Sequence, residues 1–238
     1  MAKLTRSPFS ALDTVFVPIH RAGFPFIAGG AALTLLAAAL SDTLGLILAI
    51  LTLWCVYFFR NPDRVTPVRD GLIVSPADGR VQMIARASPP ADVDMDGGER
   101  TRVSIFLNIF DVHVNRVPAT GRIDEVVYRP GKYLNASLDK ASEENERSAA
   151  SLELPDGRKI AFVQIAGLVA RRIVSELKPG QEVTAGERYG LIRFGSRVDI
   201  YLPEGVAPLV VAGQRVLGGE TVIADLQSNE TLREAVIH

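Results

Sequence analysis

The stretch RFGSRVDIYLP, residues 193–203, alternates apolar and polar side chains with the period of two that is typical of a half-buried β-strand. Val198 and Ile200 fall on one face of this predicted strand, with Arg, Asp and Tyr on the other. A glycine weakens a strand interior and marks a bulge or a close backbone approach. The pair Gly195-Ser196 nevertheless stands at the head of the strand. The stretch therefore predicts a β-rich fold and raises the question of what this pair does.

On both sides of this strand, short apolar or alternating runs end at Gly, Pro or Asp turns. Many short strands favour a mainly β (α+β) domain, an antiparallel β-sandwich or barrel, over a parallel sheet. The polar stretch 138–151 is expected to be helical or irregular, and Phe106, Ile109 and Phe110 are expected in the core. Strands are predicted at 72–75, 79–87, 102–110, 122–129, 159–166, 171–177, 189–194, 197–203, 208–211 and 220–226.

Two segments have barrel-sandwich features. SPADGRV (75–81) and LKPGQEVTAGERYGLI (177–192) share the turn–strand–turn spacing of biotinyl and lipoyl carrier domains. Neither turn places a carrier lysine between two small or apolar residues. We therefore expect the shape of such a module without its swinging-arm chemistry.

Two apolar segments without charged residues precede this domain, at 22–40 and 43–59. Each approaches the roughly 20 residues that a helix needs to cross a hydrocarbon core, and only Ser41 and Asp42 separate them. We predict a hydrophobic helical hairpin at 22–59 that anchors the chain by spanning a membrane or by dipping into one leaflet. A signal peptide accounts for this pattern less well, because it would begin closer to the N-terminus and would not repeat.

Charges around the hairpin predict its orientation. The link carries no positive charge, and the positive-inside rule then places both ends of the hairpin in the cytoplasm. We expect a cytoplasmic segment at 1–21, a linker at 60–71 and a domain at 72–238 on the cytoplasmic side of the cell (inner) membrane. The positive residues that support this orientation are Lys3, Arg6, Arg21, Arg60 and Arg64.

Composition disfavours several classes of function. A formal net charge of -1 provides no overall basic field for nucleic acid. A single cysteine, Cys55, allows neither an intramolecular disulfide nor a cysteine-based metal site. The only histidines are His20, His113 and His238, so a histidine-rich metal site is not expected.

The Gly195-Ser196 pair offers a self-processing reaction. A serine hydroxyl lies close to the carbonyl carbon of the preceding residue, and glycine obstructs its attack least. Attack would turn the amide into an ester, and elimination would leave a carboxylate at Gly195 and a dehydroalanine at residue 196, which hydrolyses to a pyruvoyl group. Such a group condenses with a primary amine and acts as an electron sink, as amino-acid decarboxylation requires. The alternative is an ordinary turn or bulge.

A serine that attacks needs a base and a carboxylate that orients the base. FLNIFDVHVNRVP (106–118) places His113 just after an apolar strand, and SPADGRV places Asp78 in a tight turn. Taken singly, each residue is better explained without catalysis: the histidine as a core or surface residue, and the aspartate as an ordinary turn residue that bonds its own backbone.

Taken in order, the motifs of this chain resemble those of the phosphatidylserine decarboxylase family, in particular its short, single-domain bacterial and archaeal type. The resemblance runs from about residue 20 to about residue 224. It rests on the hydrophobic hairpin that ends in FRNP (59–62), then SPADG (75–79), FLNIFDVHVNRVP (106–118), PGKYLNASLDKASEENER (130–147), QIAGLVARRIV (164–174) and RFGSRVDIYLP (193–203).

The resemblance implies a proenzyme that cuts itself between Gly195 and Ser196. The products would be a β chain, 1–195, and an α chain, 196–238, with Ser196 converted to the pyruvoyl cofactor. The family's Asp-His-Ser arrangement maps to Asp78, His113 and Ser196. The pyruvoyl group would form a Schiff base with the serine headgroup of phosphatidylserine in the membrane, and carbon dioxide and phosphatidylethanolamine would leave.

Two departures from larger family members bear on residue roles. Their second histidine, three residues after the first, is Arg116 here, so His113 serves self-cleavage, later protonation or both. Their Leu-Gly-Ser-Thr cleavage motif is Phe194-Gly195-Ser196-Arg197 here.

Weaker expectations concern binding and the alternatives. Arg171 and Arg172, together with Arg116, are candidates for the lipid phosphate or the substrate carboxylate, because guanidinium groups match both. A homodimer is compatible with the sequence. The alternative functions are a non-catalytic membrane-anchored adaptor with a barrel-sandwich domain and a pyruvoyl enzyme for a soluble amino acid or amine.

Overall fold

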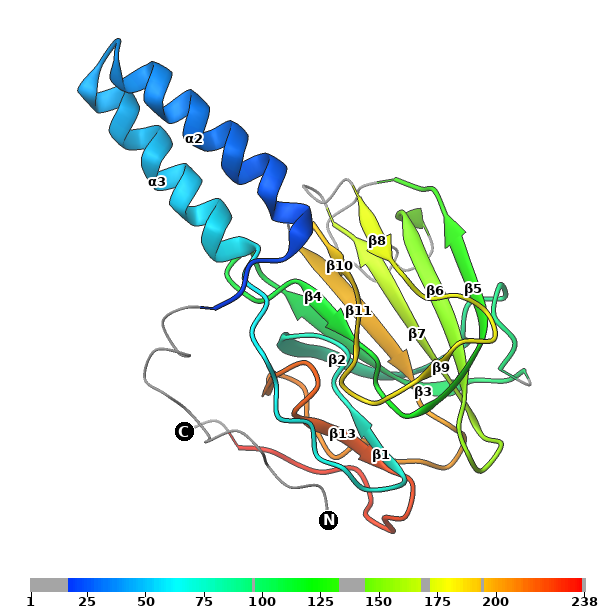
Figure 1. Cartoon of the computed structure of the whole chain (residues 1–238). Coiled ribbons are helices and arrows are strands. Elements are labelled where there is room, and N and C mark those ends of the chain that lie inside the picture. Colours follow the sequence, from blue (N-terminus) through cyan, green and yellow to red (C-terminus); the bar gives the residue numbers. More distant parts are fainter. Residues whose placement is uncertain (1–16, 96, 133–143, 168–171, 194, 237–238) are drawn as a thin grey trace. The chain divides into compact units, whose positions relative to one another are not determined.

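The chain forms two compact units, Met1–Asp63 and Arg64–His238 (Figure 1). The computed structural model describes residues 17–95, 97–132, 144–167, 172–193 and 195–236. Expectations for Phe194, for Arg171 and for the first part of 138–151 therefore lie outside the described residues.

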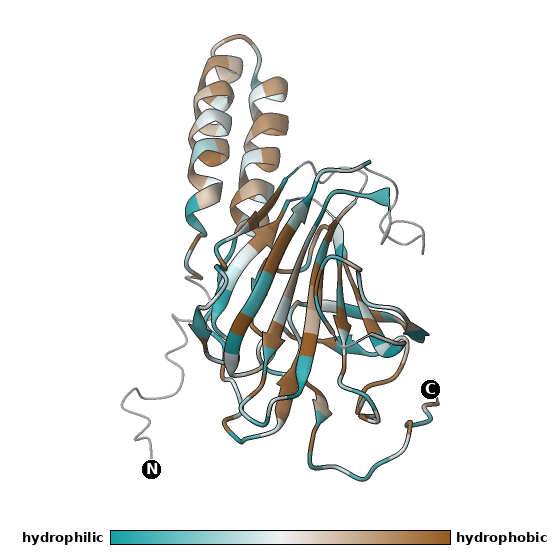
Figure 2. Cartoon of the chain, turned by 90° about the vertical axis from the view of Figure 1, so that its right-hand side faces the viewer, coloured by the Kyte–Doolittle hydropathy of each residue, from teal (hydrophilic) through white to brown (hydrophobic). Residues whose placement is uncertain are grey.

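The first unit contains a helical hairpin, as predicted. A 3-10 turn, η1 (Arg21–Gly23), leads into α2 (Phe24–Ala38), and α3 (Asp42–Phe58) runs back beside it. Pro25 fits at the start of α2, because the first turn of a helix needs no N–H donor there. Figure 2 shows that apolar residues dominate both helices.

Small residues bring α2 and α3 together. A Cβ added to Gly30 would lie 2.7 Å from Oγ1 of Thr52, and one added to Gly45 would lie 2.7 Å from Cβ of Ala38. The hydroxyls of Thr34 and Thr52 meet at 3.2 Å. Close approach at small residues, with polar contacts between helices, is how helices pack in lipid.

The other faces of the hairpin carry large apolar side chains. By length and composition, Arg21–Ala38 can cross a membrane, whereas Asp42–Phe58 is a shorter apolar helix. An exposed apolar surface of this extent indicates an interaction with a membrane or a protein. The exposed side chains include Phe24, Leu33, Leu35, Leu36, Leu40, Leu44, Leu46, Ile47, Ile50, Leu51 and Leu53.

The second unit is built from strands in three antiparallel sheets. The largest has the order β12-β2-β3-β11-β7-β6-β5-β9, a smaller one has the order β4-β10-β8, and β1 pairs with β13. The large sheet curls into a half barrel (Figure 1). The strands are β1 (Leu72–Val74), β2 (Gly79–Ala87), β3 (Arg100–Leu107), β4 (Val114–Arg116), β5 (Gly121–Arg129), β6 (Arg147–Glu153), β7 (Lys159–Ala166), β8 (Ile173–Ser175), β9 (Glu182–Val183), β10 (Arg188–Ile192), β11 (Ser196–Tyr201), β12 (Arg215–Val216) and β13 (Val222–Asp225).

The alternation in β11 determines what each face of the large sheet buries. Val198 and Ile200 join the main hydrophobic core, which fills the concave side of the sheet. Tyr201 points to the other face, where it joins a smaller cluster with Val93 and Met95 from the loop after β2. Because both faces are covered, every residue of β11 is buried.

The structure confirms the fold class, a mainly antiparallel β domain after a helical hairpin, and corrects three local predictions. The strand predicted at 102–110 ends at Leu107, where a turn begins. The end of the polar stretch 138–151 is the start of β6, because alternate residues such as Ala150 enter the core. Within 208–211, only Pro208 makes a bridge, to Ala224.

Candidate active site

The Gly195-Ser196 pair lies at one end of the central strand β11. Ser196, the first residue of β11, pairs with Leu107 of β3 and with Ala166 of β7. Its side chain is fully buried, and Oγ has no hydrogen-bond partner among the described residues. A buried hydroxyl without a partner is costly in a folded protein, so this atom is a candidate for chemistry.

Gly195 has the backbone conformation that the pair requires. Its φ is +74°, in the left-handed region that favours glycine. A Cβ at this position would meet only Cγ2 of Ile109, at 3.9 Å. Backbone conformation, and not lack of space, therefore selects glycine here.

His113, from the smaller sheet, contacts the N–H of Gly195, which belongs to the peptide just before the Gly195–Ser196 bond. It directly precedes β4 and is 1% exposed. Its Nε2 accepts a hydrogen bond from the N–H of Gly195 at 3.2 Å, and its Nδ1 lies 3.0 Å from the carbonyl oxygen of Asp111. An Nε2 that accepts carries no proton, so Nδ1 carries it and donates to Asp111. The imidazole is therefore neutral and in a defined tautomer.

Asp111 belongs to a tight turn that supports His113. The N–H of Asn108 donates to Oδ2 of Asp111 at 2.9 Å, and the guanidinium of Arg215 lies 2.8 Å from its Oδ1.

At the tip of this turn, Ile109 is 41% exposed and Phe110 57% exposed. The prediction that both are core residues was wrong, because the chain turns away from the sheet after Leu107. Phe106, which was also expected in the core, is half-buried.

Asp78 is buried just before β2, two strands away from β11 in the large sheet. Its Oδ2 forms an ion pair with Arg64 at 2.6 Å, and its Oδ1 accepts from the N–H of Gly218 at 2.8 Å. These contacts satisfy both oxygens of its carboxylate. Its part in activating Ser196 stays a prediction.

Two buried amides, which the sequence reasoning missed, lie on the concave side of the large sheet with Ser196. Nε2 of Gln164, in β7, donates to Oδ1 of Asn115, in β4, at 2.8 Å. Neither Nδ2 of Asn115 nor Oε1 of Gln164 has a partner among the described residues. Asn115 lies two residues after His113, on the same face of that segment. In the sequence, the signal for Asn115 is its spacing of two residues from His113 in the run His113-Val114-Asn115. The signal for Gln164 is weaker: it is a polar residue inside an otherwise apolar strand.

The proposed substrate-binding arginines differ in their environments. Arg116 is buried, and it donates to the carbonyl oxygen of Gly186 at 2.7 Å. Arg172 is exposed, and its carbonyl accepts from the N–H of Arg193 at 3.3 Å. Arg171 lies outside the described residues.

The opposite face of β11 holds a buried ion pair directly after Ser196. Nε of Arg197 lies 2.9 Å from Oδ1 of Asp199, and both side chains are fully buried. Nε of Arg102 lies 4.0 Å from the other carboxylate oxygen. Arg197 and Asp199 alternate with Ser196 along β11, so their side chains point to the opposite face of the sheet. They therefore affect Ser196 through the position of the strand and not by contact.

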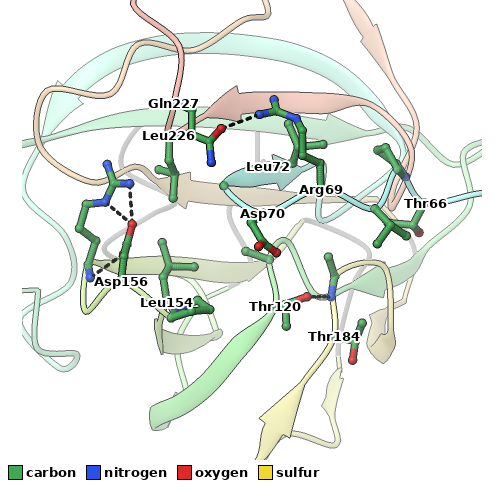
Figure 3. Close-up of a pocket in the computed structure, with 17 residues that line it drawn as sticks. Thr66, Arg69, Asp70, Leu72, Thr120, Leu154, Asp156, Thr184, Leu226 and Gln227 are labelled. Carbon is green, nitrogen blue, oxygen red and sulfur yellow. Dashed lines mark hydrogen bonds and ion pairs between the residues drawn. The ribbon is translucent and has the colours of Figure 1, made fainter. Parts of the chain in front are cut away.

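A separate hollow of about 410 Å³ lies at the other end of the large sheet (Figure 3). Leu154, beyond the end of β6, lines it, whereas Ser196 pairs with the opposite end of β7. A strand of 8 residues spans roughly 25 Å. Charged side chains around this hollow pair with one another, as Arg158 does with Asp156. The hollow is therefore distinct from the candidate active site.

Within the described residues, no three His, Cys, Asp or Glu side chains gather as a metal ion would require. The candidate site thus consists of a glycine–serine peptide, a neutral histidine and two buried amides.

Comparison with known proteins identifies the family. The family model described as phosphatidylserine decarboxylase matches residues 51–224. The chain belongs to the phosphatidylserine decarboxylase family. This assignment confirms the resemblance drawn from the motifs.

Relatives in this family match almost the whole chain. A phosphatidylserine decarboxylase proenzyme of Paramagnetospirillum magneticum is 56% identical over 223 residues, which cover 94% of this chain and 93% of that protein. The proenzyme of Cereibacter sphaeroides is 57% identical over 222 residues, with coverage of 93% and 96%. That of Rickettsia rickettsii is 56% identical over 219 residues, with coverage of 92% and 95%. The prediction of a decarboxylase, and not of an adaptor, is confirmed at the level of the family.

Proposed function

We propose that this protein decarboxylates phosphatidylserine to phosphatidylethanolamine and carbon dioxide after it cuts itself between Gly195 and Ser196. The observation that carries the proposal is the buried Oγ of Ser196, which has no hydrogen-bond partner in the described part of the chain and follows a left-handed glycine. Relatives that match this chain over more than nine tenths of their own length are named as proenzymes, a name that implies processing.

Self-cleavage begins with the hydroxyl of Ser196. Its oxygen attacks the carbonyl carbon of Gly195, and the peptide nitrogen takes up a proton and leaves as an amine, which gives an ester. Elimination then removes a proton from the α carbon of residue 196 and breaks the bond between its Cβ and the ester oxygen, so that Gly195 is released as a carboxylate. The proton of Oγ must pass to a base, and the neutral His113, which contacts the N–H of Gly195, is the candidate. Because its Nε2 first accepts the N–H of Gly195, we propose that this hydrogen bond must break before the ring takes the proton.

The site fits the pyruvoyl group that would replace Ser196. The side chain of residue 196 is enclosed, and the space beside Gly195 is open up to Ile109. This group would supply a ketone that condenses with the substrate amine and withdraws electrons from the carbon that loses carbon dioxide. On the same side of the sheet, Asn115 offers an N–H group and Gln164 a carbonyl oxygen, neither of which is hydrogen-bonded to any residue that the structure describes.

Intact mass of the purified protein tests the proposal. We expect two pieces, 1–195 and 196–238, with the second piece blocked at its N-terminus. A single 25.7 kDa chain that decarboxylates phosphatidylserine would refute self-processing.

Variants of serine and histidine separate chemistry from folding. We expect Ser196→Ala to remain uncut, whereas Ser104→Ala is cut normally, because Ser104 is an equally buried hydroxyl on the other face of the sheet. His113→Ala should accumulate the uncut chain, whereas His20→Ala, which removes a cap on η1 in the other unit of the chain, should not. Normal cutting of Ser196→Ala would exclude the proposed nucleophile. Complete cutting of His113→Ala would confine His113 to later steps.

Substrate comparison distinguishes the lipid from a soluble amine. Release of carbon dioxide from phosphatidylserine in vesicles should far exceed release from free serine. We further propose that the hairpin at 22–59 holds the domain at 72–238 on the cytoplasmic side of the membrane. Cleavage of that domain by protease added outside sealed, right-side-out cells would contradict this orientation.

A further inference from the structure

We propose that the end of the large sheet that carries Ser196 is a second membrane-contact surface, which acts in addition to the hairpin. In this proposal, the tip Ile109–Phe110 inserts among the acyl chains of an anionic bilayer, and neighbouring arginines meet its headgroups. The proposal rests on the proposed function in one respect: the bilayer is where the substrate lies.

Hydrogen bonds within the turn fix the conformation of the apolar tip. The turn from Asn108 to Asp111 is closed by the hydrogen bond from the N–H of Asp111 to the carbonyl of Asn108 at 3.0 Å. The side chain of Asn108 accepts from the N–H of Phe110 at 2.8 Å, and that of Asp111 accepts from the N–H of Asn108. These bonds hold Phe110 outward although burial of a phenylalanine is favourable. A rigid turn that presents two apolar side chains to solvent indicates an interaction surface.

The tip lies beside Gly195 of the candidate site. Ile109 is the side chain that a Cβ on Gly195 would meet, at 3.9 Å. The carbonyl of Asp111, at the end of the same turn, faces Nδ1 of His113. A bilayer that receives Phe110 would therefore lie next to the peptide at which the chemistry is proposed.

Basic residues surround the tip. Arg215 contacts Asp111, and its side chain is 62% exposed. Its cross-strand neighbour Arg80 is also exposed. On the other side of Gly195 from the tip, the N–H of Arg193 donates to the carbonyl oxygen of Arg172. Burial, together with the charge of Arg172, lowers the pKa of the Arg193 guanidinium. An anionic partner would relieve the repulsion between these two cations, so the charge around the tip complements anionic headgroups.

At the opposite end of the sheet, Arg122 pairs with Glu153, and Lys159 pairs with two carboxylates, Asp94 and Asp124. At the tip, Arg215 pairs with one carboxylate, Asp111, and Arg80 donates to the carbonyl oxygen of Gly213. Val68, at the opposite end, is 98% exposed beside the hollow in Figure 3. Val68 therefore provides a matched control: an exposed apolar residue of the same domain that the proposal places away from the bilayer.

A single tryptophan makes the test direct. Trp54 is the only one in the chain, so Trp54→Phe combined with Phe110→Trp, or with Val68→Trp, gives proteins with one emitter each. Both full-length proteins are reconstituted into vesicles of phosphatidylglycerol and phosphatidylcholine that carry bromine on their acyl chains. Because both share the hairpin as a tether, the difference between them reports which end of the domain meets the bilayer.

We expect residue 110 to lose most of its emission to the bromines and residue 68 to lose little. The loss at residue 110 should be smaller in vesicles of phosphatidylcholine alone and at high salt, since salt screens exposed charges. Equal quenching of the tryptophan emission at the two positions would overturn the proposal. Emission from residue 110 that is blue-shifted but not quenched by bromine would also overturn it, and would indicate a protein partner such as a second copy of the chain.

A functional measurement separates this proposal from the proposed function. Phe110→Asp should still cut itself, but its turnover in anionic vesicles should fall by roughly tenfold or more, from the lost burial of one aromatic side chain. Its turnover with substrate dispersed in detergent should fall far less. An equal loss in both assays contradicts membrane insertion. Quenching at residue 110 in a protein without decarboxylase activity would instead reject the proposed function and leave the surface standing.

Discussion

At the scale of single residues, two glycines of this domain are required for different physical reasons. Gly195 has space for a Cβ but has a left-handed φ of +74°. Gly79 lies where a Cβ would be 2.2 Å from the carbonyl oxygen of Phe106, so it allows β2 to approach β3. A substitution at the first should disturb chemistry, and one at the second should disturb folding.

We therefore expect Gly195→Ala to fold and to cut itself slowly. A non-glycine residue in the left-handed region costs about 1–2 kcal/mol. If the alanine variant avoids this cost by leaving the reactive conformation, cleavage should slow by roughly tenfold, which corresponds to the middle of that range. A time course of cleavage on denaturing gels measures the rate. Gly79→Ala serves as the contrast and should reduce the yield of folded protein. Unchanged cleavage of Gly195→Ala would show that the backbone conformation is not used.

Asn115 and Gln164 form a buried pair whose loss should be non-additive. Replacement of either by Leu leaves a buried amide without its partner, at a cost of about 1–3 kcal/mol. The double replacement removes both groups and should cost less than the two single costs combined. Unfolding by urea in the uncut Ser196→Ala background measures these free energies. Strict additivity would mean that the 2.8 Å hydrogen bond contributes nothing.

At the scale of elements, β11 explains how the two proposed chains stay together. It begins at Ser196 and is hydrogen-bonded along its length to β3 on one side and to β7 on the other. The strands β12 and β13, also within 196–238, pair with β2 and β1. A cut before residue 196 would thus leave the smaller chain as the central strand of a sheet made by the larger one.

The ion pair behind β11 should be important for stability. Arg197→Met leaves the buried carboxylate of Asp199 without its closest cation, and breaking such a pair costs about 3–5 kcal/mol. Arg102, at 4.0 Å, moderates this cost. Urea unfolding of the uncut chain measures it. Addition of Asp199→Leu to Arg197→Met should recover much of the loss, and a double variant as unstable as the single one would contradict the electrostatic explanation.

At the scale of the whole domain, an exposed ion pair joins the smaller proposed chain to the larger one. Arg69, before β1, contacts Asp225 at the end of β13. Burial by itself would raise the pKa of the Asp225 carboxyl, but the hydrogen bonds from Arg69 and from the N–H of Gln227 hold that pKa below its usual value. A depressed pKa means that the folded state binds this proton less readily than the unfolded state does.

The stability from this pair is therefore present above the usual aspartate pKa of about 3.9 and is lost as the pH falls towards the folded value. We expect Arg69→Gln to unfold more easily than the parent chain at pH 7, with the difference shrinking between about pH 5 and pH 3. Thermal unfolding of uncut chains at several pH values measures it. A difference that grows on acidification would contradict this sign.

The sequence was informative about local order and less so about which residues meet. Strands 79–87 and 159–166 were predicted at their observed bounds, because alternation within a strand is a local property. The helical hairpin was equally clear from its uninterrupted apolar composition. By contrast, β6 begins inside a stretch that reads as polar, because pairing with β5 and β7 overrides its weak local preference.

By itself, the sequence determined the family, the mainly β fold, the hairpin and the position of Gly195-Ser196 at the head of a strand. Each of these follows from neighbouring residues or from motifs in order along the chain. Only the tertiary structure decided that His113 faces the N–H of Gly195 from another sheet, that Asn115 meets Gln164, and that Ile109 and Phe110 point outward. The two contacts join segments that are far apart in the chain, so no local pattern contains them. Whether Ile109 and Phe110 are buried depends on where the folded chain places their turn, which neighbouring residues do not determine.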